Sequence, residues 1–234
     1  MMKKGFTLAE ILITLSIVGV VAVLSIPSVM KNYKNRMYTA QLQKVYSQIA
    51  GAAEAIMSDE QVDDFKETKA SAANSKDTDN EYIAGPAYFL NNYFKTIKQD
   101  CASSSPDSDS NACVSKNAGY YKTITGSSVS ETTPDYCVQT VNGAAICSSY
   151  NSSNQCLSIL VDVNGLESPN IAGRDIFSMD IHSSGSISDY YSGCGESSYV
   201  CASSSCTKGS TSNLYNAACG CLTSVIESGW KMEY

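Results

Sequence analysis

Residues 3–30 read KKGFTLAEILITLSIVGVVAVLSIPSVM, and the stretch from Ile11 to Met30 contains no charged side chain. Twenty helical residues rise about 30 Å, which matches the hydrocarbon core of a bilayer. A buried core helix this uniformly apolar would be unusual in a chain of 234 residues. We therefore expect a helix that spans a membrane once.

A cleaved secretory signal peptide is the alternative, because it also begins with lysines followed by an apolar run. The run here is too long for a signal peptide. No small-residue cleavage site followed by a polar segment comes after it. Glu10 lies at the mouth of the run, where a carboxylate is costly unless a cation pairs with it.

Residues 3–15, KKGFTLAEILITL, resemble the class III signal of type IV pilins and type II secretion pseudopilins. In that family a basic leader ends in Gly. A dedicated peptidase and N-methyltransferase of the membrane cuts after it and methylates the new terminus. The resemblance implies that Gly5 ends the leader, that Phe6 becomes the N-terminus and that Glu10 is the family's glutamate. Pro27 falls where many members have a helix-kinking proline.

The resemblance also implies how Glu10 is neutralised. The α-amine freed at Phe6 of a neighbouring subunit would supply the missing cation, so assembly would depend on cleavage. The alternative is that Glu10 reaches to water at the membrane interface. The implied partners are the prepilin peptidase, other pilin subunits and an inner-membrane assembly platform, and no cofactor is implied.

The cysteines indicate on which side of the membrane the chain lies. The positive-inside rule does not decide the orientation, because Lys and Arg flank the apolar run at both ends. All ten cysteines follow residue 100, a density typical of exported, disulfide-bonded proteins. They are Cys101, Cys113, Cys137, Cys147, Cys156, Cys194, Cys201, Cys206, Cys219 and Cys221. We expect a single-pass protein of a bacterial cytoplasmic membrane with its N-terminus inside. Its destination would be a periplasmic pseudopilus or a cell-surface pilus.

Four segments are expected along the chain. They are a leader over 1–5, a transmembrane and assembly helix over 6–30, an amphipathic helix over 31–58 and an extracytoplasmic head over 59–234. Apolar residues recur at steps of three and four in the third segment, which marks one face of a helix. They are Tyr38, Leu42, Val45, Tyr46, Ile49, Ala52, Ala53 and Ile56.

The head is expected to be α+β and pilin-like, with the long helix packed on an antiparallel sheet. Residues 58–81 are predicted to form a polar loop or a frayed helix end. A short helix is predicted to begin at Pro86 and to end near Asp100. Predicted strands cover 120–125, 136–141, 144–150, 156–163, 177–181 and 187–191. The tail from Cys194 to Cys221 has few apolar residues, so disulfides are expected to hold it.

Two disulfides are suggested by local sequence. Cys101 and Cys113 would close a polar loop. Asn142-Gly143 is a hairpin signal, and a three-residue loop over 141–143 would place Cys137 opposite Cys147. A two-residue loop would put these two cysteines on opposite faces, so their pairing requires the longer turn.

Charge and motif content exclude some function classes. The net charge is −7, and from Asp59 onward 10 basic and 21 acidic residues give −11. A nucleic-acid partner is therefore not expected, because phosphate binding needs clustered Lys and Arg. One histidine, His182, and the lack of a G-x-S-x-G motif argue against an enzyme.

The most motif-like part of the head is VDVNGLESPNIAGRDIF, residues 161–177. It offers oxygen ligands suited to Ca²⁺, as do calcium loops in several relatives of the pilin type. The candidate ligands are Asp162, Asn164, Glu167, Asn170 and Asp175. The EF-hand pattern is not met, and the interpretation that we favour is an Asx turn at 162–165 followed by a Gly/Pro loop.

These features predict a structural subunit, a prepilin cleaved after Gly5 and assembled into a type IV pilus or a secretion pseudopilus. An alternative is a minor, tip-located pilin whose cysteine-rich head binds a ligand or surface. A plain single-pass anchored ectodomain is less favoured. The 15 tyrosines suit either packing in a small sheet, which we favour, or surface recognition.

Overall fold

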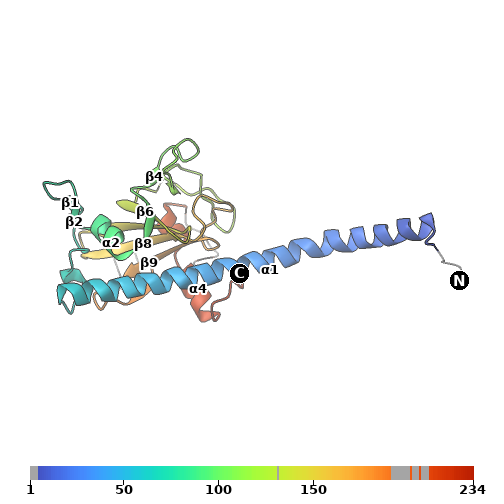
Figure 1. The fold of residues 1–234 in the computed structure, drawn as a ribbon. Helices are drawn as coiled ribbons and strands as arrows, with labels where there is room; N and C mark the ends of the chain where they lie inside the picture. Colours follow the sequence, from blue (N-terminus) through green and yellow to red (C-terminus); the bar gives the residue numbers. More distant parts are fainter. Residues whose placement is uncertain (1–4, 131, 191–200, 202–205, 207–210) are drawn as a thin grey trace. The chain divides into compact units, whose positions relative to one another are not determined.

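The computed structural model describes residues 5–130, 132–190, 201, 206 and 211–234, without the side chain of Ser28. The chain divides into two compact units, Met1–Met37 and Tyr38–Tyr234. Helix α1, Leu8–Glu60, contributes residues to both units (Figure 1). In the first unit α1 exposes nearly all of its described side chains.

In the second unit, α1 buries one face in the head (Figure 1). The apolar face predicted for this part of the helix is confirmed. Seven of its eight members are buried in the main core, and Tyr46 is half-buried against it. The regular three- and four-residue spacing puts these side chains on one stripe, so the helix buries them together; of the polar residues in this stretch, Thr39 is buried with them.

A six-stranded antiparallel sheet forms the centre of the head, in the order β10-β9-β8-β7-β6-β3. Its strands are β3 Thr96–Gln99, β6 Tyr136–Thr140, β7 Ala145–Asn151, β8 Cys156–Asp162, β9 Ile176–Ile181 and β10 Ile187–Asp189. Every residue of β8 and β9 is buried. Burial of successive residues requires that both faces of the sheet are covered.

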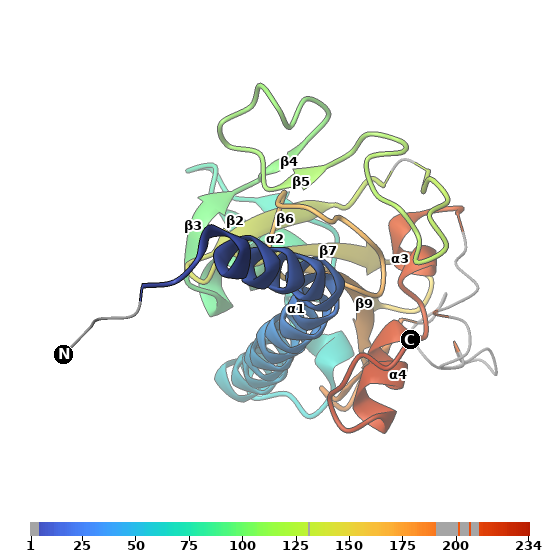
Figure 2. The same cartoon turned by 90° about the vertical axis from the view of Figure 1, so that its right-hand side faces the viewer.

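The two faces have different covers (Figure 2). On one face α1 and α2, Pro86–Tyr93, pack against residues such as Val138, Ile146 and Ile159. On the other face α3, Leu214–Ala217, packs together with the segment around Tyr121 and with Leu160. Helix α4, Cys221–Glu227, contacts β9 and β10 near the edge of the sheet and adds Leu222 and Val225 to the first core.

Two short strand pairs lie outside the main sheet. Strands β1 and β2, Ser75–Lys76 and Tyr82–Ala84, form an antiparallel hairpin. Strands β4 and β5, Ala102–Ser103 and Val114–Ser115, pair in parallel.

Three sequence predictions were wrong in detail. Helix α2 ends at Tyr93 rather than near Asp100, because Phe94 is extended and the chain enters β3. The polar stretch 58–81 contains a 3₁₀ helix, η1 Phe65–Glu67, whose Phe65 is fully buried edge-on against Phe89. The strand predicted over 120–125 makes only isolated bridges at Lys122.

The β6–β7 hairpin has the three-residue loop that the cysteines require. Thr140 N–H donates to the carbonyl of Ala144 at 2.8 Å, so the loop is 141–143. Gly143 has φ +88°, the left-handed conformation that this loop type needs and that glycine adopts without a steric cost. Cys137 is then in register with Cys147, and the two form a disulfide.

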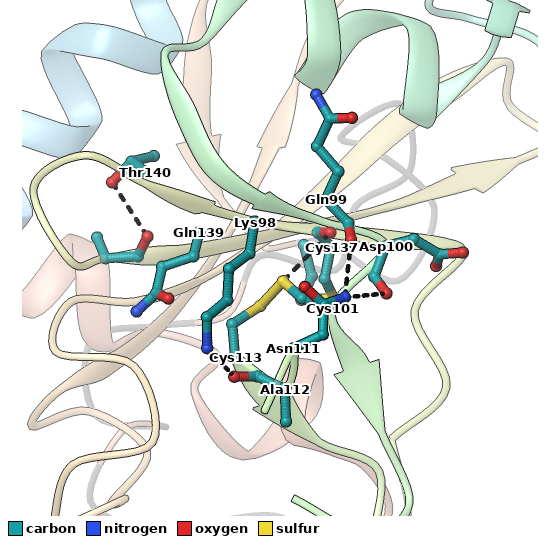
Figure 3. Close-up of a disulfide and its surroundings, with 12 residues drawn as sticks. Lys98, Gln99, Asp100, Cys101, Asn111, Ala112, Cys113, Cys137, Gln139 and Thr140 are labelled. Atoms are coloured by element: carbon teal, nitrogen blue, oxygen red, sulfur yellow. Dashed lines mark hydrogen bonds between the residues drawn. A yellow bond between two sulfur atoms is a disulfide. The ribbon is translucent and has the colours of Figure 1, made fainter. Parts of the chain in front are cut away.

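A second disulfide joins Cys101 and Cys113 beside the first (Figure 3). The backbone carbonyl of Cys137 lies 3.4 Å from the Cys101 sulfur. The loop closed by this disulfide is also tied to β3, because Lys98 Nζ donates to the carbonyl of Ala112 at 2.9 Å (Figure 3). The two pairings suggested by local sequence are therefore both present and adjacent.

The C-terminal region contains further disulfides, Cys201–Cys219 and Cys206–Cys221, and Cys156 is also disulfide-bonded. Cys194 lies outside the described residues, as does Tyr191 at the end of the last predicted strand. Gly173 has φ +83°, and a Cβ there would lie 2.6 Å from the sulfur of Cys221. The loop before β9 therefore needs glycine where this disulfide packs against it.

Asp189 at the end of β10 attaches α4 to the sheet. Its carboxylate is buried and accepts hydrogen bonds from the backbone N–H groups of Gly220, Thr223 and Tyr190, at 2.8, 2.7 and 2.9 Å. Burial raises the pKa of Asp189 to about 6. The hydrogen bonds lower this pKa, but by less than burial raises it.

We expect Asp189 to make the stability of the head pH-dependent. The folded state holds this proton more tightly than the unfolded chain, so its contribution is fully present below pH 3.8 and is lost as the pH rises through about 6. The free energy of unfolding that is lost in this way is on the order of 3 kcal/mol. Denaturant unfolding of the full chain in detergent, followed by fluorescence of Trp230 packed on Tyr46, measures it.

The matched variant is Asp189→Asn, which cannot titrate. Between about pH 4 and pH 7 we expect the free energy of unfolding of the variant to fall by less than that of the wild type, because the contribution of Asp189 is missing. Parallel pH profiles of the variant and the wild type would contradict the assignment.

Candidate functional site

The peptide bond between Gly5 and Phe6 lies in a short non-helical segment just before α1. Phe6 is 85% exposed, and apart from the chain neighbours of Gly5 no described atom lies within 4 Å of the position that a Cβ on Gly5 would take. A non-helical, uncovered peptide bond is the form that a peptidase can bind. Within the residues that the structure describes, nothing covers the predicted cleavage site.

Thr7 and Glu10 begin helix α1 with a capping box. The N–H and the hydroxyl of Thr7 both donate to Oε2 of Glu10 at 2.8 Å, and the Glu10 N–H donates to the Thr7 hydroxyl at 3.3 Å. This reciprocal pattern satisfies backbone donors that the first turn of a helix leaves unpaired. Sequence reasoning missed Thr7, although the T-x-x-E spacing that signals the cap is visible in the sequence.

The capping box itself supplies no positive charge to Glu10. Both bonds from Thr7 end on Oε2, and neither uses Oε1. In the part of the chain that the structure describes, no cationic side chain pairs with Glu10. The carboxylate is therefore held in a fixed place at the helix start, with one oxygen free of these bonds.

Beyond Glu10 the helix is apolar and uncovered. It is the one helix within the described residues that is long and apolar enough to cross a membrane, judged by length and composition. Large side chains along it, such as Leu15, Val20 and Leu24, are each more than half exposed. Pro27 lies inside α1 and does not end it.

In the head, the loop between β8 and β9 forms the predicted Asx turn. Asn164 N–H donates to Oδ1 of Asp162 at 3.3 Å. Asp175 organises the far side of the loop, because its two carboxylate oxygens accept from the N–H groups of Asn170 and Ile171 at 2.8 and 2.7 Å. Glu167 is exposed, and the described hydrogen bond there uses its backbone carbonyl.

Three buried side-chain oxygens of this loop have no hydrogen-bond partner, namely Asp162 Oδ2, Asn164 Oδ1 and Asn170 Oδ1. Burial, and then the charge of Asp175, raise the pKa of Asp162 well above its usual value. Burial also raises the pKa of Asp175. No three His, Cys, Asp or Glu side chains gather as a metal centre among the described residues. Any cation here would therefore rest on two carboxylates together with amide oxygens, which are ligands that suit Ca²⁺.

His182 makes hydrogen bonds within the turn after β9. It follows β9, its N–H donates to the carbonyl of Ser186, and its Nε2 lies 2.6 Å from the hydroxyl of Ser188. These contacts place His182 in the turn between β9 and β10.

Comparison with known proteins identifies the N-terminal segment. Residues 1–26 match the family model of the prokaryotic N-terminal methylation motif. No curated protein and no solved structure gives a significant match. The motif covers Gly5, Phe6 and the capping box. The chain thus carries the prepilin signal of type IV pilins and pseudopilins at the start of a pilin-like α+β fold.

Proposed function

We propose that this protein is a structural, non-catalytic prepilin. It is cleaved between Gly5 and Phe6, methylated on the amine of Phe6 and packed into a type IV pilus or a secretion pseudopilus through α1. The observation that carries the proposal is the accessible Gly5–Phe6 bond beside a capping box inside the methylation motif. The head would lie outside the cytoplasm, where its disulfides are stable.

The chemistry of the site supports a coupling between cleavage and assembly. Before cleavage, Phe6 has an amide nitrogen without charge. Cleavage creates a cationic amine one residue before Thr7, next to the helix start that holds Glu10. In an apolar surrounding such a pair is strongly favoured over two separate charges, because burying an unpaired charge is costly. The Oε1 atom of Glu10 is the natural acceptor for the amine of a neighbouring copy.

The exposed apolar surface of α1 supports the same proposal. In the membrane, lipid covers this surface. Outside the membrane this surface would need an apolar partner, and helix α1 of another copy presents such an apolar surface. The prepilin peptidase and an inner-membrane assembly platform are the partners that the proposal requires.

The capping box allows the charge of Glu10 to be tested apart from its place in the helix. Glu10→Gln keeps a residue that can complete a capping box but removes the charge. Thr7→Ala removes the hydroxyl cap at a cost of about 1 kcal/mol and keeps the charge. We expect Glu10→Gln to reach the membrane and to be absent from filaments, and Thr7→Ala to enter filaments. Immunoblots of membrane and sheared-filament fractions measure both.

Two results would contradict this account. One is wild-type filament incorporation of Glu10→Gln. The other is a block in Thr7→Ala as strong as that in Glu10→Gln, which would assign the effect to the helix start and not to the charge. Methylation of Phe6 in each variant is the control for processing.

We also propose that the β8–β9 loop binds Ca²⁺. The unpartnered buried oxygens of Asp162, Asn164 and Asn170 support it, because each is a hard oxygen ligand that the fold leaves unsatisfied. A bound cation would neutralise the adjacent carboxylates of Asp162 and Asp175, whose pKa values burial raises.

Calcium is then expected to stabilise the folded head. At a free concentration of about 100 times Kd the gain is about 2.7 kcal/mol, which raises the melting temperature by several degrees. Thermal unfolding of the chelator-treated chain, with and without added Ca²⁺, measures it. Asp162→Asn should abolish the increase, and Asp107→Asn, on an exposed loop, should retain it. A melting temperature that is the same with Ca²⁺ and with chelator would contradict the proposal that this loop binds Ca²⁺.

A further inference from the structure

A polar hollow of about 310 Å³ opens on the head, on the sheet face that α3 covers. It lies at the end of the β7–β8 hairpin, where Ser149, Asn151 and Ser158 contribute hydroxyl and amide groups. Tyr190, which follows β10, and Tyr215 of α3 form its aromatic side. These residues come from β7, β8, α3 and the segment after β10, so the folded head assembles the hollow.

The aromatic side is held in place. The rings of Tyr190 and Tyr215 have centroids 5.3 Å apart and are tilted by 39°. The Tyr215 hydroxyl lies 3.0 Å from the hydroxyl of Ser149, and the Tyr215 carbonyl accepts from Ser178 at 2.8 Å. Tyr215 is therefore fixed at both its ring and its backbone, and it supports the more exposed ring of Tyr190.

None of the described residues that line the hollow carries an ionisable acid or base other than tyrosine. Burial raises the pKa of Tyr190 and of Tyr215, so both hydroxyls stay protonated at neutral pH. Nearby carboxylates raise these pKa values further: Asp180 acts on Tyr190, and Asp135, ahead of Asp180, acts on Tyr215. An anion is therefore a poor ligand, and the described lining presents neutral hydroxyl and amide groups beside an aromatic surface.

We propose that this hollow binds a neutral pyranose sugar. A pyranose has an apolar C–H face that packs on a tyrosine ring and hydroxyls that bond to serine and asparagine side chains. The volume lies at the small end of the range for ligand sites and suits one or two sugar units. Such binding goes beyond a purely structural subunit and would give the head a recognition function.

Saturation-transfer NMR on the full chain tests the proposal, with disulfides intact and in a zwitterionic detergent without a sugar headgroup. The probes are the methyl glycosides of D-glucose, D-galactose and N-acetyl-D-glucosamine, with N-acetylneuraminic acid as the charged comparison. We expect transfer to at least one neutral glycoside and none to the acid. Tyr190→Ala should weaken binding about tenfold through loss of ring contact. Tyr88→Ala, on helix α2 at the opposite face of the sheet, should leave it unchanged.

A second variant keeps the test independent of folding. Ser152 is exposed on the rim, so Ser152→Trp fills the hollow without altering the core, and it should also abolish transfer. Absence of transfer to every neutral glycoside overturns the proposal. It is equally overturned by transfer to N-acetylneuraminic acid alone, or by transfer that survives in Ser152→Trp and Tyr190→Ala. Filament assembly plays no part in the measurement, so failure of the proposed pilin function would not affect its outcome.

Discussion

The main constraint on this molecule is a single carboxylate placed directly before a run of twenty uncharged residues in helix α1. Thr7 holds the Glu10 carboxylate against the first turn of α1 through two hydrogen bonds to one oxygen. The local contacts stabilise the helix start but supply no positive charge. In an apolar surrounding the charge needs a cation. The methylation motif suggests where that cation arises, at the amine that cleavage would free on Phe6.

The same helix also organises the head. From Tyr38 onward one stripe of α1 is buried in the core on one face of the sheet, and a second core with α3 covers the other face. Neighbouring disulfides fix the β6–β7 hairpin and the loop beside it, while Asp189 and two more disulfides fix the C-terminal region. The protein therefore combines an exposed apolar helix with a disulfide-bonded head. The β8–β9 loop and the tyrosine-lined hollow are the two places in the head where we propose that a ligand binds.

How far the sequence predicts this structure depends on the range of the interactions. The buried stripe of α1 and the Cys137–Cys147 register follow from local periodicity and from one turn, and both are present. Helix α4 and the burial of Phe65 were not predicted, because partners distant in sequence decide them: β9 and β10 for α4, and Phe89 for Phe65. The unpartnered oxygens of Asn164 and Asn170 likewise depend on how the loop folds back on itself. Thr7 is different, since T-x-x-E is a local signal that the sequence already contains.

The central claim is that the chain is processed as a prepilin. The most direct test is the N-terminal sequence and intact mass of the mature protein, taken from the envelope and sheared surface fractions of its native host. The account predicts a chain that begins at Phe6 and carries one added methyl group, with a mass that changes on reduction and alkylation by the number of its disulfides. A chain that keeps Met1 or Met2, or one that begins after about Ser25, would contradict it. The first would be a plain membrane anchor and the second a secreted protein.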